Sequence, residues 1–305
     1  MQQPWDAMLT MSVVHFMAYP ECINGTGPIA ETVRELALDP FFGAAEVSWI
    51  KDPAERAKVR QIAEQSRLQL GYGGQAVLLT SKLSLNDLDP AGRKAAVEAM
   101  QRSIDEAAEL GCKRLAFLTG PDPGDARRAE ALDLLADSVT TLCRYGQEKG
   151  IGLTLETFDR DVDKKSLVGP SDMAAEFAAR IRADYPDFGL LYDLSHLPLL
   201  RESVREALTT LKDYLVHIHV GNAVVTAGLP GYGDLHPRFG YPGGENDVPE
   251  LVEFLEALIN IGYFKSDVPT DKPVLTFEVK PYDDDTPELI VAHTKRTFKR
   301  AWAQL

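Results

Sequence analysis

The chain has 305 residues, of which 45% are hydrophobic and 26% are charged, so it can build a large core and its composition excludes general disorder. Its formal net charge of −14 repels polyanions, and no basic cluster overcomes that field, which argues against a nucleic-acid partner. No segment reaches the roughly 18 consecutive uncharged apolar residues of a membrane span, so no membrane partner is expected.

Eight short apolar runs alternate with eight longer stretches of helical pattern along the chain. The runs predict strands at Ser12–Met17, Ala44–Trp49, Leu68–Tyr72, Arg114–Leu118, Gly152–Thr157, Phe188–Tyr192, Leu215–Val220 and Val274–Val279. The longer stretches predict helices at Pro28–Leu38, Pro53–Ser66, Pro90–Leu110, Asp125–Lys149, Ser171–Ala183, Ser203–Lys212, Val248–Ile261 and Thr286–Trp302. Proline at the start of the first three helices suits a first helical turn.

The alternation of strands and helices predicts the fold class. Strands separated by helices are parallel, because each helix returns the chain to the same end of the sheet. Eight such units predict an α/β fold, a (β/α)8 TIM barrel, formed by a single domain over residues 1–305. A doubly wound open sheet is the structural alternative, but the segment AYPECINGTG after Met17 lacks the Gly-rich phosphate loop of that fold.

The connection over residues 221–247 is rich in Gly, Pro and aromatic residues. It follows the seventh predicted strand and is far longer than the usual βα loop of about 2 to 6 residues. Loops of this length in compact domains are usually lids or binding loops. We therefore expect it to cover the C-terminal mouth of the barrel, where active sites of this fold are built.

Residue types that bind metals stand at the ends of four predicted strands. Glu156 ends the fifth strand, Asp193 follows the sixth, His219 lies near the end of the seventh and Glu278 near the end of the eighth. Taken alone, each carboxylate is as often a cap or a salt-bridge partner as a metal ligand, and the histidine is more often a core residue. The strand ends of a barrel, however, converge at one place. Three converging carboxylates would repel one another without a cation. The set predicts one divalent metal and favours Mn²⁺, with Mg²⁺, Co²⁺ or Zn²⁺ as alternatives.

These strand-end residues resemble the metal site of the xylose-isomerase-like barrel superfamily, which includes ketose 3-epimerases, inosose dehydratases, hydroxypyruvate isomerase and endonuclease IV. The specific part of the likeness includes His196, three residues after Asp193. The resemblance implies that Glu156 and Glu278 are the catalytic acid/base pair and that His196 binds a substrate oxygen. It implies a metal-dependent sugar isomerase or epimerase that abstracts a proton next to a carbonyl.

The chain departs from two branches of that superfamily. Ketose 3-epimerases have a Glu six residues after the strand-five ligand and an Arg six residues after the strand-seven ligand, where this chain has Val162 and Val225. Endonuclease IV takes further His ligands from early strands, which the third and fourth predicted strands lack. The pair Asp234 and His236 is nevertheless similar to its Asp-x-His motif. An AP-endonuclease-type phosphodiesterase is thus the less favoured alternative.

Four segments are similar to the α subunits of bacterial C-glycoside deglycosidases, namely SVVHFMAYPEC, FDRDVDKK, DLSHLPLL and HPRFGYPGGEND. This resemblance implies an alternative function, a lyase that abstracts a proton beside the 3-keto group of a C-glycoside and eliminates the aglycone. It also implies a small β subunit as a partner, while a homo-oligomer stays open. In either function the substrate is a small-molecule sugar or sugar conjugate.

Five further residues have two interpretations each. His15 is either a substrate contact or a core histidine, and His236 is either a substrate contact or a residue that fixes the long loop. Arg160 and Lys280 lie just beyond ligand-bearing strand ends, where they would neutralise an oxyanion or form surface salt bridges. His217 points to the same side as His219, one layer deeper, where it supports the metal ligand or packs.

Cysteine usage and the N-terminus bear on location. The three cysteines are widely spaced and form no CxxC pair, which fits a reducing compartment. Residues 1–12 lack the basic start and the apolar run of a signal peptide. We therefore predict a cytoplasmic protein.

Overall fold

Eight parallel strands form a nearly closed barrel in the computed structural model, which describes residues 4–265 and 272–305. The strands are β1 Thr10–Val13, β2 Ala44–Val47, β3 Gln69–Gly73, β4 Arg114–Phe117, β5 Gly152–Glu156, β6 Gly189–Asp193, β7 Leu215–Val220 and β8 Val274–Phe277. Seven neighbouring pairs form parallel ladders, and an isolated parallel bridge between Val14 and Glu46 joins β1 to β2. The predicted (β/α)8 TIM barrel is confirmed; residues 1–3 and 266–271 of the predicted domain lie outside the described part.

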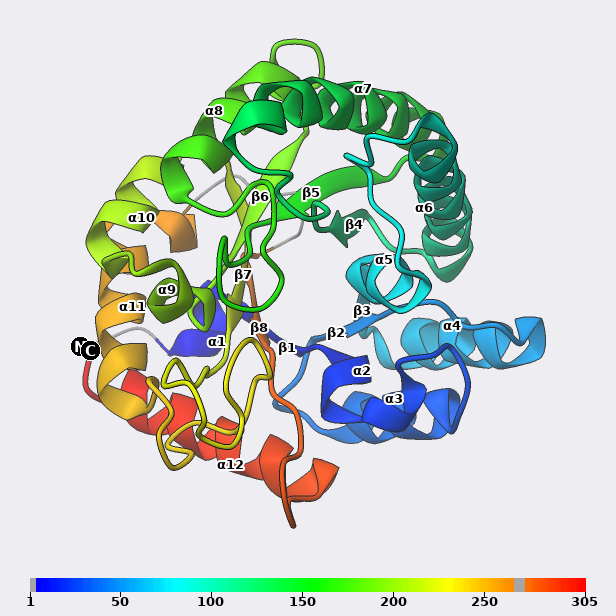
Figure 1. Cartoon of the computed structure of the whole chain (residues 1–305). Coiled ribbons are helices and arrows are strands. Elements are labelled where there is room, and N and C mark those ends of the chain that lie inside the picture. Colours follow the sequence, from blue (N-terminus) through cyan, green and yellow to red (C-terminus); the bar gives the residue numbers. More distant parts are fainter. Residues whose placement is uncertain (1–3, 266–271) are drawn as a thin grey trace.

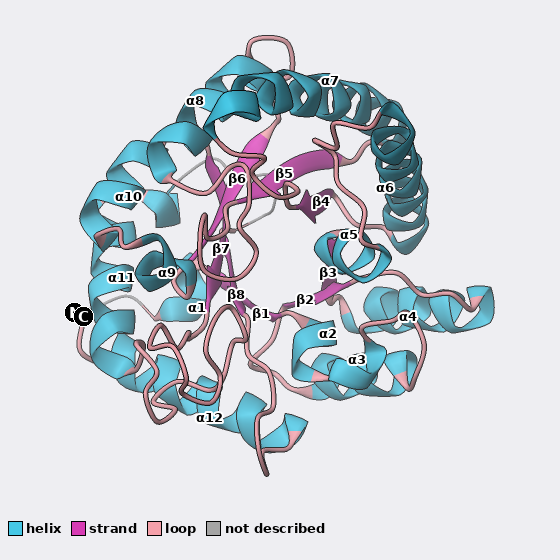
Figure 2. Ribbon diagram, viewed as in Figure 1, coloured by secondary structure: helices cyan, strands magenta, loops and turns pink. Residues whose placement is uncertain are grey.

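Helices form a ring around the strands (Figures 1 and 2). The ring consists of α3 Ile29–Leu38, α4 Pro53–Ser66, α6 Pro90–Leu110, α7 Asp125–Lys149, α8 Ser171–Arg182, α10 Val204–Leu211, α11 Val248–Asn260 and α12 Pro287–Trp302. Local sequence explains several boundaries. The side chains of Asp52 and Asp89 accept the amide hydrogens of Ala54 and Ala91 at the starts of α4 and α6. The ends of α6 and α7 are followed by glycines in the left-handed conformation.

Several short helices lie outside the predicted pattern. They are α1 Trp5–Met8, α2 His15–Ala18, η1 Pro20–Cys22, α5 Gln75–Ser81, α9 His196–Leu200 and η2 Tyr263–Lys265. The prediction of a strand over Ser12–Met17 was wrong in its second half, because β1 ends at Val13 and His15 begins α2. His15, Phe16 and Ala18 are buried on α2. A short buried helix and a buried strand both appear in the sequence as a short apolar run, so the pattern does not distinguish them.

The segment 221–247 connects β7 to α11 without a helix or strand of its own, and it lies beside β8 and α12 (Figure 1). Buried amide side chains hold its two ends together. Asn246 donates to the carbonyl oxygens of Leu194 and Gly221, and its own backbone amide donates to the side chain of Asn222. Hydrogen bonds therefore fix the two ends of this loop and anchor it to the residues that follow β6 and β7. Among the described helices, none is long and apolar enough to cross a membrane.

Candidate metal centre

The four predicted ligands meet at the C-terminal ends of the last four strands. Glu156 and Asp193 are the last residues of β5 and β6, His219 is the second-last residue of β7, and Glu278 directly follows β8. All four side chains are buried. One ligand atom from each lies within 4.8 Å of the ligand atoms of the other three. The barrel thus gathers three carboxylates and one imidazole, distant in sequence, into one group that we call the four-ligand cluster.

Two carboxylate oxygens of the cluster are left without a partner. Gln75 Nε2 donates to Glu156 Oε2 at 2.7 Å, and the backbone amide of Ser195 donates to Asp193 Oδ1 at 2.7 Å. The other oxygens of these two groups, Glu156 Oε1 and Asp193 Oδ2, are buried and accept no hydrogen bond. Buried polar atoms are normally satisfied, so unpaired acceptors that share a site indicate a missing positive partner.

Electrostatics support the same interpretation. Burial, and then the neighbouring Glu278 carboxylate, raise the pKa of Glu156 to about 8. Burial also raises the pKa of Asp193. Ionising these two buried carboxyl groups therefore costs free energy in the metal-free protein. A bound divalent cation would stabilise their charged forms. Three oxygen donors and one nitrogen donor fit Mn²⁺, Mg²⁺, Co²⁺ or Zn²⁺.

Glu46 contacts the imidazole of His219 on the side of the ring that faces away from the cluster. His219 Nδ1 lies 2.6 Å from Glu278 Oε2, whereas its Nε2 lies 3.0 and 3.1 Å from the two oxygens of Glu46. Since a carboxylate accepts, each nitrogen donates where it meets one. Nδ1 is the nitrogen that faces the cluster, so it would give up its hydrogen to bind a metal, while Nε2 keeps its hydrogen on Glu46. Glu46 also accepts from Thr276 and from His217 Nε2, the latter at 2.6 Å. His217 therefore belongs to the support of His219.

Sequence reasoning missed Glu46, although a signal was present. The residue stands within the apolar strand β2, where its side chain is 7% exposed. Charged residues are almost never fully buried unless they are paired. A glutamate inside an apolar strand therefore predicts a buried partner, although the sequence does not say which of the six histidines it meets.

The long loop brings a second group of polar residues against the cluster. His236 Nε2 lies 2.8 Å from Asp234 Oδ1 and 3.6 Å from Glu278 Oε1, and its Nδ1 lies 3.9 Å from Asp193 Oδ2. The backbone amide of Lys280 donates to the carbonyl of His236 at 2.7 Å, which ties the loop to the segment after β8. The structure thus makes His236 an anchor of the loop and places it beside the cluster, while its contact with a substrate stays a prediction.

His196 lies beside the same loop and has both ring nitrogens engaged. Its Nδ1 donates to the carbonyl oxygen of Thr157 at 2.6 Å, and its Nε2 lies 3.0 Å from Asp234 Oδ1. Although burial alone would lower it, the Asp234 carboxylate raises the pKa of His196 to about 10. Lys164 Nζ lies 2.9 Å from Asp234 Oδ2 and completes the surroundings of that carboxylate. Asp234 therefore joins the long loop to α9 and to the β5–α8 connection.

The remaining predicted contact residues have no described side-chain contact with the four ligands. His15 Nε2 lies 2.7 Å from Thr32 Oγ1, and its ring stacks on Tyr19, as expected of a core histidine. Arg160 donates from Nη2 to the carbonyl oxygen of Leu167. No contact among the described residues joins the side chains of His15 or Arg160 to the four ligands. The Lys280 side chain is partly exposed, and only its backbone has a described bond near the site.

Comparison with known proteins places the chain in a family. Residues 37–300 match the model of the xylose isomerase-like TIM barrel family. The chain belongs to this family. No curated protein matches the sequence at a significant level. The membership agrees with the resemblance inferred from the strand ends.

Solved structures show the same fold across the whole xylose isomerase-like barrel. An L-ribulose 3-epimerase has a TM-score of 0.74 at 16% identity, over 97% of this chain and 95% of that one. The IOLI protein, crystallised with a bound zinc atom, has a TM-score of 0.72 at 16% identity, over 97% and 99%. The 3-keto-D-glucoside 4-epimerase from E. coli has a TM-score of 0.68 at 15% identity, over 95% and 99%. At these identities the likeness establishes the fold.

Proposed function

We propose that this protein is a sugar isomerase or epimerase that depends on one divalent metal, with Mn²⁺ favoured. The observation that carries the proposal is the four-ligand cluster, in which two buried carboxylate oxygens have no partner at the mouth of the barrel. Active sites of this fold lie at that end. A bound cation would supply charge to polarise a carbonyl and its neighbouring hydroxyl.

The proposed acid/base groups are Glu156 and Glu278, the first and last ligands along the chain. Glu156 Oε2 accepts from Gln75, and Glu278 Oε2 lies 2.6 Å from His219 Nδ1, the nitrogen proposed to bind the metal. Glu156 Oε1, which accepts no bond, is the oxygen assigned to the cation, and Glu278 Oε1 lies 3.6 Å from His236. We propose that these two carboxylates both bind the metal and remove or return a proton next to a carbonyl.

Similar folds with sugar substrates support this assignment. The names of the solved structures describe an L-ribulose 3-epimerase and a 3-keto-D-glucoside 4-epimerase. The zinc in the IOLI structure supports a divalent metal. We transfer from these proteins the chemistry of epimerisation and not a particular sugar.

A lyase acting on a 3-keto C-glycoside is the second candidate. The observation that favours it is the departure from ketose 3-epimerases at Val162 and Val225. Val162 lies in the loop after β5, where its backbone amide donates to the buried carboxylate of Asp159. Its aliphatic side chain cannot donate or accept a hydrogen bond from a sugar, so the substrate is held differently. A small second subunit and a cytoplasmic location stay predictions beside this alternative.

The test combines metal analysis with hydrogen exchange. We expect about one divalent metal per chain, and less in an Asp193→Ala variant that stays folded. In deuterated water the metal-loaded protein should exchange the α-hydrogen of a keto-sugar, whereas aglycone release from a 3-keto C-glycoside would assign the lyase. Full activity in chelator would defeat the proposal. Three bound metals with phosphodiester cleavage would assign the endonuclease alternative.

A further inference from the structure

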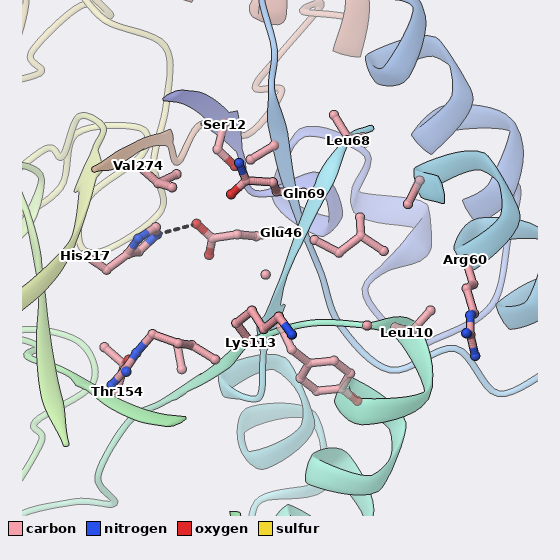
Figure 3. A pocket seen from close by; sticks show the side chains of 18 of the residues that line it. Ser12, Glu46, Arg60, Leu68, Gln69, Leu110, Lys113, Thr154, His217 and Val274 are labelled. Atoms are coloured by element: carbon pink, nitrogen blue, oxygen red, sulfur yellow. Dashed lines mark hydrogen bonds and ion pairs between the residues drawn. The ribbon is translucent and has the colours of Figure 1, made fainter. Parts of the chain in front are cut away.

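A cavity opens at the end of the barrel opposite the four-ligand cluster. Its volume is about 420 Å³, and its lining includes the first residues of four strands, Ala44, Gln69, Arg114 and Val274. First residues of parallel strands lie at the N-terminal end, whereas the four ligands lie at the C-terminal end. The cavity therefore opens at the other end of the barrel from the four-ligand cluster, with Glu46 between the two; Figure 3 shows its lining.

The walls of the cavity are mainly apolar, and small residues make the space. Leu68, Leu70 and Tyr72 contribute from β3 and the residue before it, and Leu110 contributes from the end of α6. Gly71 lies in the same strand and has no side chain to fill the interior. Lys113 is exposed, and in Figure 3 Arg60 lies on the opposite side of the cavity from His217.

The inner end of the cavity is polar and incompletely satisfied. Ser12 is fully buried, and its hydroxyl has no hydrogen-bond partner. His217 and Glu46 face each other there, joined by the 2.6 Å contact between Nε2 and Oε1 (Figure 3). With Nε2 donating to Glu46, the His217 ring presents Nδ1 as an acceptor. The inner end therefore offers one hydroxyl, which can donate and accept, and one ring acceptor.

We propose that this cavity binds a small uncharged aryl alcohol, with the hydroxyl at Ser12 and His217 and the ring extending over Gly71 towards the apolar side of β3. The apolar walls suit a ring. The carboxylate of Glu46 at the inner end disfavours an anionic group there. The hydroxyl would satisfy the buried serine, because it can accept from Ser12 and donate to the histidine. This inference does not rest on the proposed enzymatic function.

The test uses 2-naphthol as the probe, titrated by calorimetry into the full-length protein. We expect saturation at one molecule per chain and weaker binding of 2-naphthoate, which carries a charge in place of the hydroxyl. Ser12→Ala should weaken naphthol binding about 2- to 10-fold, the usual effect of one lost hydrogen bond. Ser138→Ala is the matched control, since Ser138 is a buried serine of α7 that does not line the cavity.

Substitutions that fill the cavity with a larger side chain test naphthol binding independently of the Ser12 hydroxyl. Leu70→Trp should abolish naphthol binding, and Val216→Phe, from the β7 wall, serves as a second filling variant if the first does not fold. Thermal unfolding identifies the variants that are folded. Unchanged affinity in Ser12→Ala, retained binding in a folded filling variant, or tighter binding of 2-naphthoate than of 2-naphthol would each overturn the proposal.

Discussion

Replacing Glu46 by Gln tests the support that holds His219. The substitution keeps the size of the side chain but removes its charge and exchanges one acceptor oxygen for a donor nitrogen. In the structure this carboxylate accepts hydrogens from His219 Nε2, His217 Nε2 and the Thr276 hydroxyl. A glutamine cannot satisfy all three donors, because its amide nitrogen does not accept.

The expected magnitude follows from this count. A buried donor left without a partner costs about 1–3 kcal/mol. Loss of a partner behind a metal-binding histidine typically lowers metal affinity about 10- to 100-fold, which corresponds to about 1.4–2.7 kcal/mol. We therefore expect Glu46→Gln to weaken Mn²⁺ binding by one to two orders of magnitude, even though Glu46 is not itself in the four-ligand cluster.

The assay is competition with a chromophoric chelator, with thermal unfolding in parallel to establish that the variant is folded. Glu35→Gln is the matched control, because Glu35 accepts from Tyr19 on a different part of the barrel. A folded Glu46→Gln protein that binds Mn²⁺ within twofold of the unchanged protein would refute the argument that this hydrogen bond orients the histidine.

Three further predictions follow. Glu156→Gln or Glu278→Gln should lower the initial rate at least about 10²-fold while retaining part of the metal, measured by elemental analysis; full turnover would contradict the acid/base assignment. Lys164→Met removes the cation beside Asp234 and should raise KM more than it lowers kcat, and unchanged steady-state kinetics would show that this contact does not hold the loop. Burial lowers the pKa of His15 to about 3. The unfolded chain takes up that proton near pH 6.5, so folding stability falls as the pH drops from 6.5 towards 3, by about 2 kcal/mol at pH 5. Urea unfolding at pH 7.5 and 5 should show a smaller difference in His15→Gln, and an equal difference would contradict the assignment.

Local periodicity determined much of the fold and of the site. Alternating apolar runs and amphipathic stretches predict a βα repeat, because a buried strand and a surface helix each impose their own spacing on apolar residues. Strand-end residues could then be selected, since the topology alone brings the ends of parallel strands together. Glu156, Asp193, His219 and Glu278 were found in this way, and the structure brings them within reach of one ion.

Tertiary structure decided which contacts each side chain makes. The sequence contains Glu46 and His219, yet only closure of the barrel brings these residues, 173 positions apart, into contact. The run after Val13 is equally apolar as a strand or as the short helix α2, and burial in three dimensions selects the helix. The loop histidine His236 lies against the cluster through long-range bonds that no local pattern encodes. The physical reason is the same in each case: spacing along the chain fixes which face a residue occupies, whereas its partner depends on how distant faces pack.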